Sequence, residues 1–251
     1  MPRFLCGSCW SDRRAALAGE CGGMLDLVLE LVAPLKCAGC DEPGAALCEA
    51  CWSAVVRIDP LRACPRCGEP RRPGGRHACA CSDAAFEAVR CFGELAPPLS
   101  SAISLHKDPG ERRYGPMLGA LAATACADWA GWPDAVVPVP PTRSARLRRG
   151  YDHTAPLARA VADRLGSQAA GLLVARDRAD QRALDRRGRR ENVRDAFAVR
   201  VGVSVPARVL LVDDVMTTGA TLDAAARALK DSGAREVRAV AVARACGGAA
   251  G

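Results

Sequence analysis

The sequence predicts an α/β protein in which a mainly parallel sheet follows a small, cysteine-rich metal-binding module. Eight of the 14 cysteines fall between Cys37 and Cys81, in closely spaced pairs typical of metal ligands. From about residue 84, short apolar segments typical of strands alternate with alanine-rich segments typical of helices. This alternation indicates right-handed crossovers between parallel strands.

The composition excludes a wholly disordered chain. Of the 251 residues, 49% are hydrophobic and 25% are charged, whereas only 4% are aromatic. The longest apolar stretch, residues 24–35, is about half as long as a membrane span and contains Asp26 and Glu30. We therefore expect a short amphipathic helix there and no transmembrane segment. No signal-peptide pattern precedes it, which favours the cytoplasm and reduced cysteines.

The chain is expected to divide into four segments. Residues 1–23 have no sustained apolar period and hold three cysteines without a fourth partner, so they form a disordered arm or precede a true start at Met24. Residues 24–83 are expected to form a helix and a double zinc-ribbon module. Residues 84–246 then form the α/β domain, and residues 247–251 form a flexible tail.

The elements of the α/β domain follow from apolar patterning. Strands are expected at 85–95, 135–140, 172–175, 208–215 and 237–243, where apolar residues alternate or run together. Helices are expected at 99–107, 115–130, 154–166 and 222–231. Proline and glycine separate several of these segments, notably at Pro97, Pro109 and Gly233.

Four cysteine pairs supply two tetrahedral zinc sites with no ligand left over. Joining consecutive pairs closes the shorter loops and is our preferred arrangement, although an interleaved cross-brace and ligation by His77 stay open. Closed four-thiolate sites leave no position for water, so we expect structural zinc and no metal catalysis. Gly68, directly after the third pair, allows the backbone to fold under the metal. The eight ligands are Cys37, Cys40, Cys48, Cys51, Cys64, Cys67, Cys79 and Cys81.

A second group of polar residues follows the strand at 208–215. Asp213 and Asp214 stand at its end, and carboxylates there can accept hydrogen bonds from ribose hydroxyls and balance an oxocarbenium-like charge. Backbone N–H groups and hydroxyls at the start of the next helix can bind a phosphate. In an open parallel sheet, ligands bind at this edge. The sequence therefore predicts a site for a phosphorylated ribose, completed by Thr217, Thr218, Gly219, Ala220 and Thr221.

This segment resembles the loop of type I phosphoribosyltransferases that binds 5-phosphoribosyl-1-pyrophosphate (PRPP). In that family an apolar strand leads into two acids and then Thr-Thr-Gly-x-Thr. The resemblance implies a type I phosphoribosyltransferase-like domain over residues 84–246, with Asp213 and Asp214 as catalytic acids and residues 213–214 and 217–221 binding PRPP. It also implies Mg²⁺, held through the oxygens of the ligand rather than by a protein cage.

Other segments resemble the ComF family of phosphoribosyltransferase-like proteins, which is linked to natural competence and DNA uptake. The zinc module lies in front of the domain, as in that family, and the remaining similar segments are 105–107, 137–141, 148–151, 181–184, 190–193 and 196–197. The family usually has Arg-Gly-Phe-Asn-Gln where this chain has Arg-Gly-Tyr-Asp152-His153. An acid and an imidazole thus replace two amides.

The resemblance also implies where the pyrophosphate of PRPP would lie. By position, residues 140–143 resemble the loop that binds pyrophosphate, and the arginine-rich segment 177–192 resembles the loop that closes over the site. A diphosphate leaving group needs cations where its charge develops. The candidates for that role are Lys107, Arg143 and Arg149.

Two functions remain open from the sequence. The first is an enzyme that transfers the phosphoribosyl group of PRPP to an unidentified nitrogen nucleophile, or the reverse. The alternative is a non-catalytic adaptor that handles single-stranded DNA or docks a protein of the competence machinery. Residues 143–200 favour an anionic partner, because 15 arginines against 7 acids give a local charge of +8. Tyr151 and Phe197 are the only aromatic residues in that stretch, so a base-stacking surface is poorly supplied.

Overall fold

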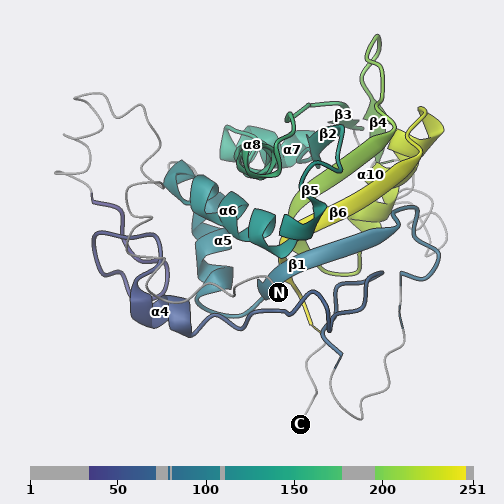
Figure 1. Ribbon diagram of the computed structural model, residues 1–251. Helices are drawn as coiled ribbons and strands as arrows, with labels where there is room; N and C mark the ends of the chain where they lie inside the picture. The colour runs from purple at the N-terminus through teal and green to yellow at the C-terminus, as the bar shows by residue number, and fades with distance from the viewer. Residues whose placement is uncertain (1–33, 72–78, 80, 108–110, 177–195, 247–251) are drawn as a thin grey trace, which may run out of the picture.

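The computed structural model describes residues 34–71, 79, 81–107, 111–176 and 196–246 (Figure 1). Most of the helix expected at 24–35, together with His77 and the arginine-rich segment 177–192, lies outside these residues. The helices are α4 (Glu49–Ser53), α5 (Leu99–Lys107), α6 (Gly115–Ala125), α7 (Arg143–Arg149), α8 (Thr154–Leu165) and α10 (Ala220–Asp231). The strands are β1 (Ala88–Glu94), β2 (Ala135–Pro138), β3 (Leu173–Ala175), β4 (Phe197–Val199), β5 (Arg208–Met216) and β6 (Glu236–Arg244). Within the described residues, no helix has the length and apolar character needed to cross a bilayer.

Four parallel strands form the central sheet, in the order β1-β6-β5-β2. The expectation of a mainly parallel α/β sheet is therefore confirmed. In the register of the two central strands, Asp213 lies opposite Ala241 and Met216 lies opposite Arg244. All of β2 and the segment 209–212 of β5 are buried, as expected for strands covered on both faces.

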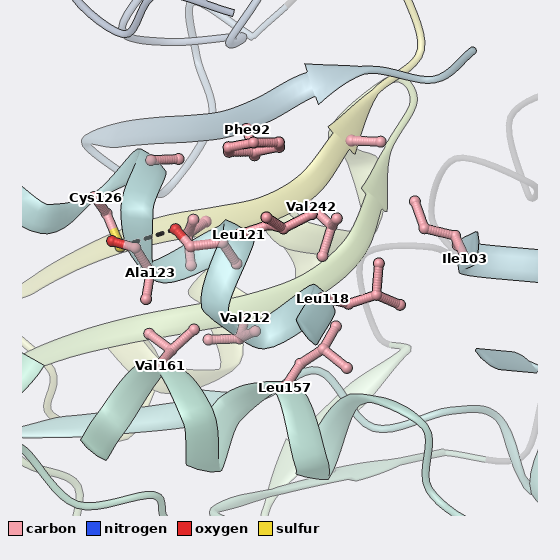
Figure 2. Close-up of a cluster of buried hydrophobic side chains, with 14 of the residues drawn as sticks. Phe92, Ile103, Leu118, Leu121, Ala123, Cys126, Leu157, Val161, Val212 and Val242 are labelled. Atoms are coloured by element: carbon pink, nitrogen blue, oxygen red, sulfur yellow. Dashed lines mark hydrogen bonds between the residues drawn. The ribbon is translucent and has the colours of Figure 1, made fainter. Parts of the chain in front are cut away.

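Helices cover both faces of this sheet and divide the core into two clusters. On one face, α5, α6 and α8 pack against alternate residues of β5, including Leu210 and Val212 (Figure 1). Figure 2 shows Leu118, Leu157 and Val212 of this cluster packed together. On the other face, α10 packs against the intervening residues of the same strand. Alternation along β5 thus sends successive side chains to opposite faces.

The strand expected at 172–175 forms outside the central sheet. It is β3, and it pairs antiparallel with β4, with Leu173 opposite Val199. Strand β4 was not predicted, because its three residues are too few to give a periodic pattern. The strand-helix alternation therefore describes the central sheet and not this two-stranded addition.

Helix α7 is the main element that apolar patterning missed. Only Ala145 of its seven residues is buried, and four of the seven are arginines, so the segment has no apolar face. The available signals were its caps: the Thr142 hydroxyl accepts a hydrogen bond from the Ala145 amide, and Gly150 ends the helix with a positive φ of 74°. The helix expected at 115–130 is also shorter than predicted, since α6 ends at Ala125 and a 3-10 turn follows.

Candidate functional site

A cavity of about 220 Å³ lies at the edge of the sheet where β2 and β5 end. Residues that follow β2 line one side of it, and Asp213 of β5 lines another. The edge at the carboxyl ends of parallel strands is the usual place for a ligand in open sheets. The full lining is Val139, Pro140, Pro141, Thr142, Ala145, Arg149, His153, Ala175, Arg176, Ala196, Phe197, Asp213 and Thr221.

The two predicted acids lie near the end of β5, as expected, and they have different environments. Asp213 is half-buried and borders the cavity. Asp214 is 4% exposed and is absent from the cavity lining. Burial, followed by the neighbouring Asp214 charge, raises the pKa of Asp213. Asp213 is thus the one of the two acids that borders the cavity.

Asp214 is held by two basic side chains, one at the end of α5 and one just before α8. Its Oδ2 lies 2.9 Å from Lys107 Nζ at the end of α5 and 3.1 Å from His153 Nε2 just before α8. Burial alone would raise the pKa of Asp214, but the hydrogen bond with His153 and the charge of Lys107 hold that pKa below its usual range. Lys107, expected at pyrophosphate, is therefore paired with the second acid.

Two histidines connect α5 to this site, and sequence patterns indicate them only weakly. His106 is fully buried, and its Nε2 lies 2.8 Å from the backbone oxygen of His153. Burial lowers the pKa of His106, which favours the neutral ring. The signal that could have identified His153 is its place in a motif where the related family has an amide.

The phosphate loop, defined here as residues 217–221, joins β5 to α10. Thr217 and Thr218 are exposed, and Thr221 borders the cavity. Gly219 has a φ of +80°, so the backbone there adopts a conformation that favours glycine. Helix α10 begins at Ala220, two residues earlier than expected, and its first N–H groups therefore belong to this loop.

The segment expected to bind pyrophosphate also borders the cavity. Pro140, Pro141 and Thr142 line it, and Thr142 then caps α7. Arg149, at the end of α7, is a lining residue, whereas Arg143 is exposed at the start of that helix. The structure thus brings Arg149 to the same cavity as Asp213 and leaves Arg143 outside the lining.

The first cysteine cluster consists of Cys37, Cys40, Cys48 and Cys51, whose sulfurs all lie within 4.8 Å of one another. The sulfurs of Cys40 and Cys48 are 3.6 Å apart. Two sulfurs of a tetrahedral zinc site, at Zn–S bonds of about 2.3 Å, are about 3.8 Å apart. Backbone amides of Gly39 and Cys48 also donate to Cys37 Sγ, which suits a thiolate. The four residues therefore fit a structural zinc ion.

The second cysteine cluster consists of Cys64, Cys67 and Cys79. The sulfurs of Cys64 and Cys79 are 3.8 Å apart, again the separation expected around zinc. Consecutive pairs thus group together, as preferred from the loop lengths. Gly68 has a φ of +68°, in agreement with its predicted turn.

Cys81 differs from the expected arrangement. Within the described part of the chain its sulfur does not join the group of Cys64, Cys67 and Cys79. Its Sγ instead donates a hydrogen bond of 3.3 Å to the backbone oxygen of Thr218, in the phosphate loop. Spacing in the sequence could not reveal this contact, because 137 residues separate the two positions.

Comparison with known proteins gives consistent matches. The phosphoribosyl transferase domain family matches residues 153–249. Competence protein F of Haemophilus influenzae is 29% identical over 210 residues, covering 79% of this chain and 90% of that protein. Competence protein ComFC of Streptococcus pneumoniae is 24% identical over 204 residues, covering 80% of this chain and 88% of that protein.

A further relative is the DNA utilization protein YhgH of Escherichia coli, which is 29% identical over 223 residues, covering 83% of this chain and 96% of that protein. All three relatives thus match over most of their own length. The domain match covers the acids and the phosphate loop, and the cysteine clusters precede it. The chain is thus similar over most of its length to competence and DNA utilization proteins, and its C-terminal part matches the phosphoribosyl transferase domain family.

Proposed function

We propose that this protein binds PRPP, or a related phosphoribosyl compound, together with Mg²⁺ in the cavity at the end of β2 and β5. The observation that carries the proposal is the cavity lining, which collects Asp213, Thr221, Arg149 and the segment 140–142 around one space. An acid, a phosphate-binding helix start and a cation are the three contacts that a phosphoribosyl diphosphate needs.

Each part of the ligand has a matching group in the cavity. The phosphate loop offers backbone N–H groups and threonine hydroxyls to a 5′-phosphate. Asp213 accepts hydrogen bonds from the ribose hydroxyls, and Arg149 neutralises the diphosphate. Mg²⁺ bound to oxygens of the ligand would neutralise more of the diphosphate charge. Mg²⁺ sites in proteins usually combine one or two carboxylates with phosphate oxygens of the substrate.

The contacts of Asp214 suggest a division of labour between the two acids. Asp213 would contact the ribose, whereas Asp214 orders Lys107 and His153 beside it. If the bond between the ribose and the diphosphate breaks, the electron pair leaves with the diphosphate and positive charge develops on the sugar. A carboxylate at Asp213 stabilises that charge, so we propose a phosphoribosyltransferase-type reaction with a nitrogen nucleophile.

Isothermal titration of PRPP with Mg²⁺ tests this proposal. Asp213→Asn should weaken binding at least about tenfold, because an amide cannot lose a proton to become a charged acceptor when the ligand and Mg²⁺ bind. Asp163→Asn is the matched control, since it removes the same charge from an exposed position on α8. Undetectable PRPP binding by the wild type, or equal affinities for wild type and Asp213→Asn, would refute the proposal.

A second candidate function is binding of single-stranded DNA in a competence context. It is supported by the exposed arginines of α7 beside the cavity, including Arg143, Arg146 and Arg148, and by the names of the relatives, which refer to competence and DNA utilization. Neutralising Arg146 and Arg148 together should lower the affinity for single-stranded DNA and flatten its dependence on salt. DNA affinity that does not change with salt would exclude this function, leaving protein docking as the adaptor role.

The remaining expectations accompany this proposal. We keep the division into a module at 24–83 and a phosphoribosyltransferase-like domain at 84–246, with segments 1–23 and 247–251 outside both. Thiolate clusters need reduced cysteines, which supports the cytoplasm as the compartment.

A further inference from the structure

The second cysteine cluster is connected to the phosphate loop through Arg244. This arginine ends β6 and is 7% exposed. Its Nε donates a hydrogen bond of 2.7 Å to the backbone oxygen of Cys67, a residue of the cluster. Its guanidinium also donates to the backbone oxygens of Met216 and Thr217, where β5 enters the phosphate loop. One buried side chain therefore holds both the cluster turn and the loop.

Cys81 makes a second connection at the same place. Its sulfur contacts the backbone oxygen of Thr218 at 3.3 Å. A Cβ built on Gly219 would lie only 2.8 Å from that sulfur, so the loop packs directly against Cys81. The loop is therefore held from the cysteine module by a sulfur as well as by a guanidinium.

The turn between Cys64 and Cys67 is itself anchored to the α/β domain. Arg66, inside that turn, donates hydrogen bonds to four backbone oxygens of the segment that follows Cys81, namely those of Ser82, Ala84, Phe86 and Glu87. Asp223 of α10 accepts a hydrogen bond of 2.7 Å from the Ala85 amide. The cluster turn, this segment and the start of α10 thus form a continuous network of contacts.

The first cluster packs elsewhere. A Cβ on Gly39 would lie 2.8 Å from Pro98 Cβ, just before α5, and the Tyr114 hydroxyl donates to the Lys36 oxygen at 2.7 Å. Cys37 belongs to the core cluster on the face of α5, α6 and α8, whereas Cys64 and Cys67 belong to the cluster on the face of α10. The two metal sites are therefore attached to different parts of the domain.

We propose that metal occupancy of the second cluster, and not of the first, sets the order of the phosphate loop and hence its affinity for a phosphoribosyl ligand. A metal held by Cys64, Cys67 and Cys79 fixes the Cys67 oxygen that orients Arg244. Loss of the metal frees that oxygen, and Arg244 then no longer holds the loop oxygens in one position. The part concerning affinity rests on the proposed function, whereas the part concerning loop order does not.

Such a connection is reciprocal. If metal at the second cluster raises the affinity for the ligand, the ligand raises the affinity for the metal by the same factor. Binding of PRPP with Mg²⁺ should therefore lower the fraction of zinc that the second cluster loses to a competing chelator at equilibrium. The release from the first cluster provides the internal control.

Titration of PRPP with Mg²⁺ into full-length, zinc-loaded variants tests the coupling. Cys79→Ser removes a ligand of the second cluster, and Cys40→Ser removes an exposed ligand of the first. We expect Cys79→Ser to weaken PRPP binding about tenfold, within the usual range of coupling between sites, and Cys40→Ser to change it less than about twofold. Equal losses in the two variants would overturn the proposal.

Hydrogen exchange of the amides at 217–221 gives a readout that needs no ligand. Arg244→Lys keeps the charge but loses the planar guanidinium, so we expect about tenfold faster exchange in the loop. Arg238→Lys is the matched control, because Arg238 lies on the same strand but over the rings of Trp129 and Trp132. This pair also covers the case in which Cys79→Ser does not fold.

The outcomes separate the two proposals. A wild type that binds no PRPP refutes the proposed function, and loop exchange then decides the coupling alone. A wild type that binds PRPP normally, with loop exchange unchanged in both Arg244→Lys and Cys79→Ser, refutes the coupling and leaves the function intact. Faster exchange in both variants with normal exchange in Arg238→Lys and Cys40→Ser supports the coupling.

Discussion

Replacement of Gly219 by alanine tests the close packing between the phosphate loop and the cysteine module. Two physical costs add at this position. The φ of +80° is a left-handed conformation, which costs an alanine about 1–2 kcal/mol. The new Cβ would also lie 2.8 Å from Cys81 Sγ and 2.9 Å from Met216 Cε, and overpacking of this kind costs about 1–3 kcal/mol. The free energy of unfolding should therefore fall by about 2–5 kcal/mol in total.

Gly166 provides a control that isolates the second cost. It has a φ of +68° at the end of α8, and no atom lies within 4 Å of the Cβ that alanine would add. Gly166→Ala should therefore lose only about 1–2 kcal/mol. Urea denaturation of the zinc-loaded proteins, with the slope checked for constancy, measures both losses. If the two variants lost equal free energy to within about 0.5 kcal/mol, the contact between Gly219 and Cys81 would be refuted.

Three other predictions concern charge and metal. Because the pKa of Asp213 is raised, the folded chain keeps a proton there after the unfolded chain has lost it, and the free energy of unfolding falls as pH rises above about 4. Asp213→Asn should therefore stabilise the protein more near pH 8 than near pH 5 in urea denaturation, and an equal effect at both would contradict this. Lys107→Met should lower the free energy of unfolding by about 2–3 kcal/mol. This loss is smaller than the loss expected for a fully buried ion pair, because the Lys107 side chain is 28% exposed. Adding Asp214→Asn to the Lys107→Met variant should recover part of the lost free energy. The folded chain should release about two zinc ions to a chromogenic chelator, and a value near one would remove one of the two cysteine sites.

The central sheet was predictable because its signals are local. β5 is an apolar run bounded by polar residues, and a strand buried on both faces must have such a run. The helices α5 and α8 were predicted within one residue of their observed ends for the same reason. Helix α7 was not predicted, because Ala145 is the only one of its seven residues that is buried. A helix that contributes little to the core leaves little periodicity in the sequence.

The contacts that distinguish this site were not predictable, because they join residues that are distant in the chain. Lys107 at the end of α5 and His153 just before α8 both reach Asp214, and Arg244 reaches Cys67 across 177 positions. Spacing between cysteines predicts which pairs can share a metal, since the ligands are neighbours. It carries no information about Cys81 and Thr218, whose contact depends on how the module packs on the sheet.

The roles of the two acids follow from the geometry of the strand that carries them. Asp213 and Asp214 are adjacent, and adjacent residues of a strand point to opposite faces. Asp213 therefore borders the cavity, on the side of Thr221, while Asp214 meets the basic residues beside α5 and α8. A motif of two acids suggests that both carboxylates contact the ribose in the same way. Adjacent residues of one strand, however, cannot both point into the same cavity. Substitution of Asp213 should accordingly affect ligand affinity more than stability. Substitution of Asp214 leaves Lys107 and His153 without their shared partner, so it should affect both ligand affinity and stability.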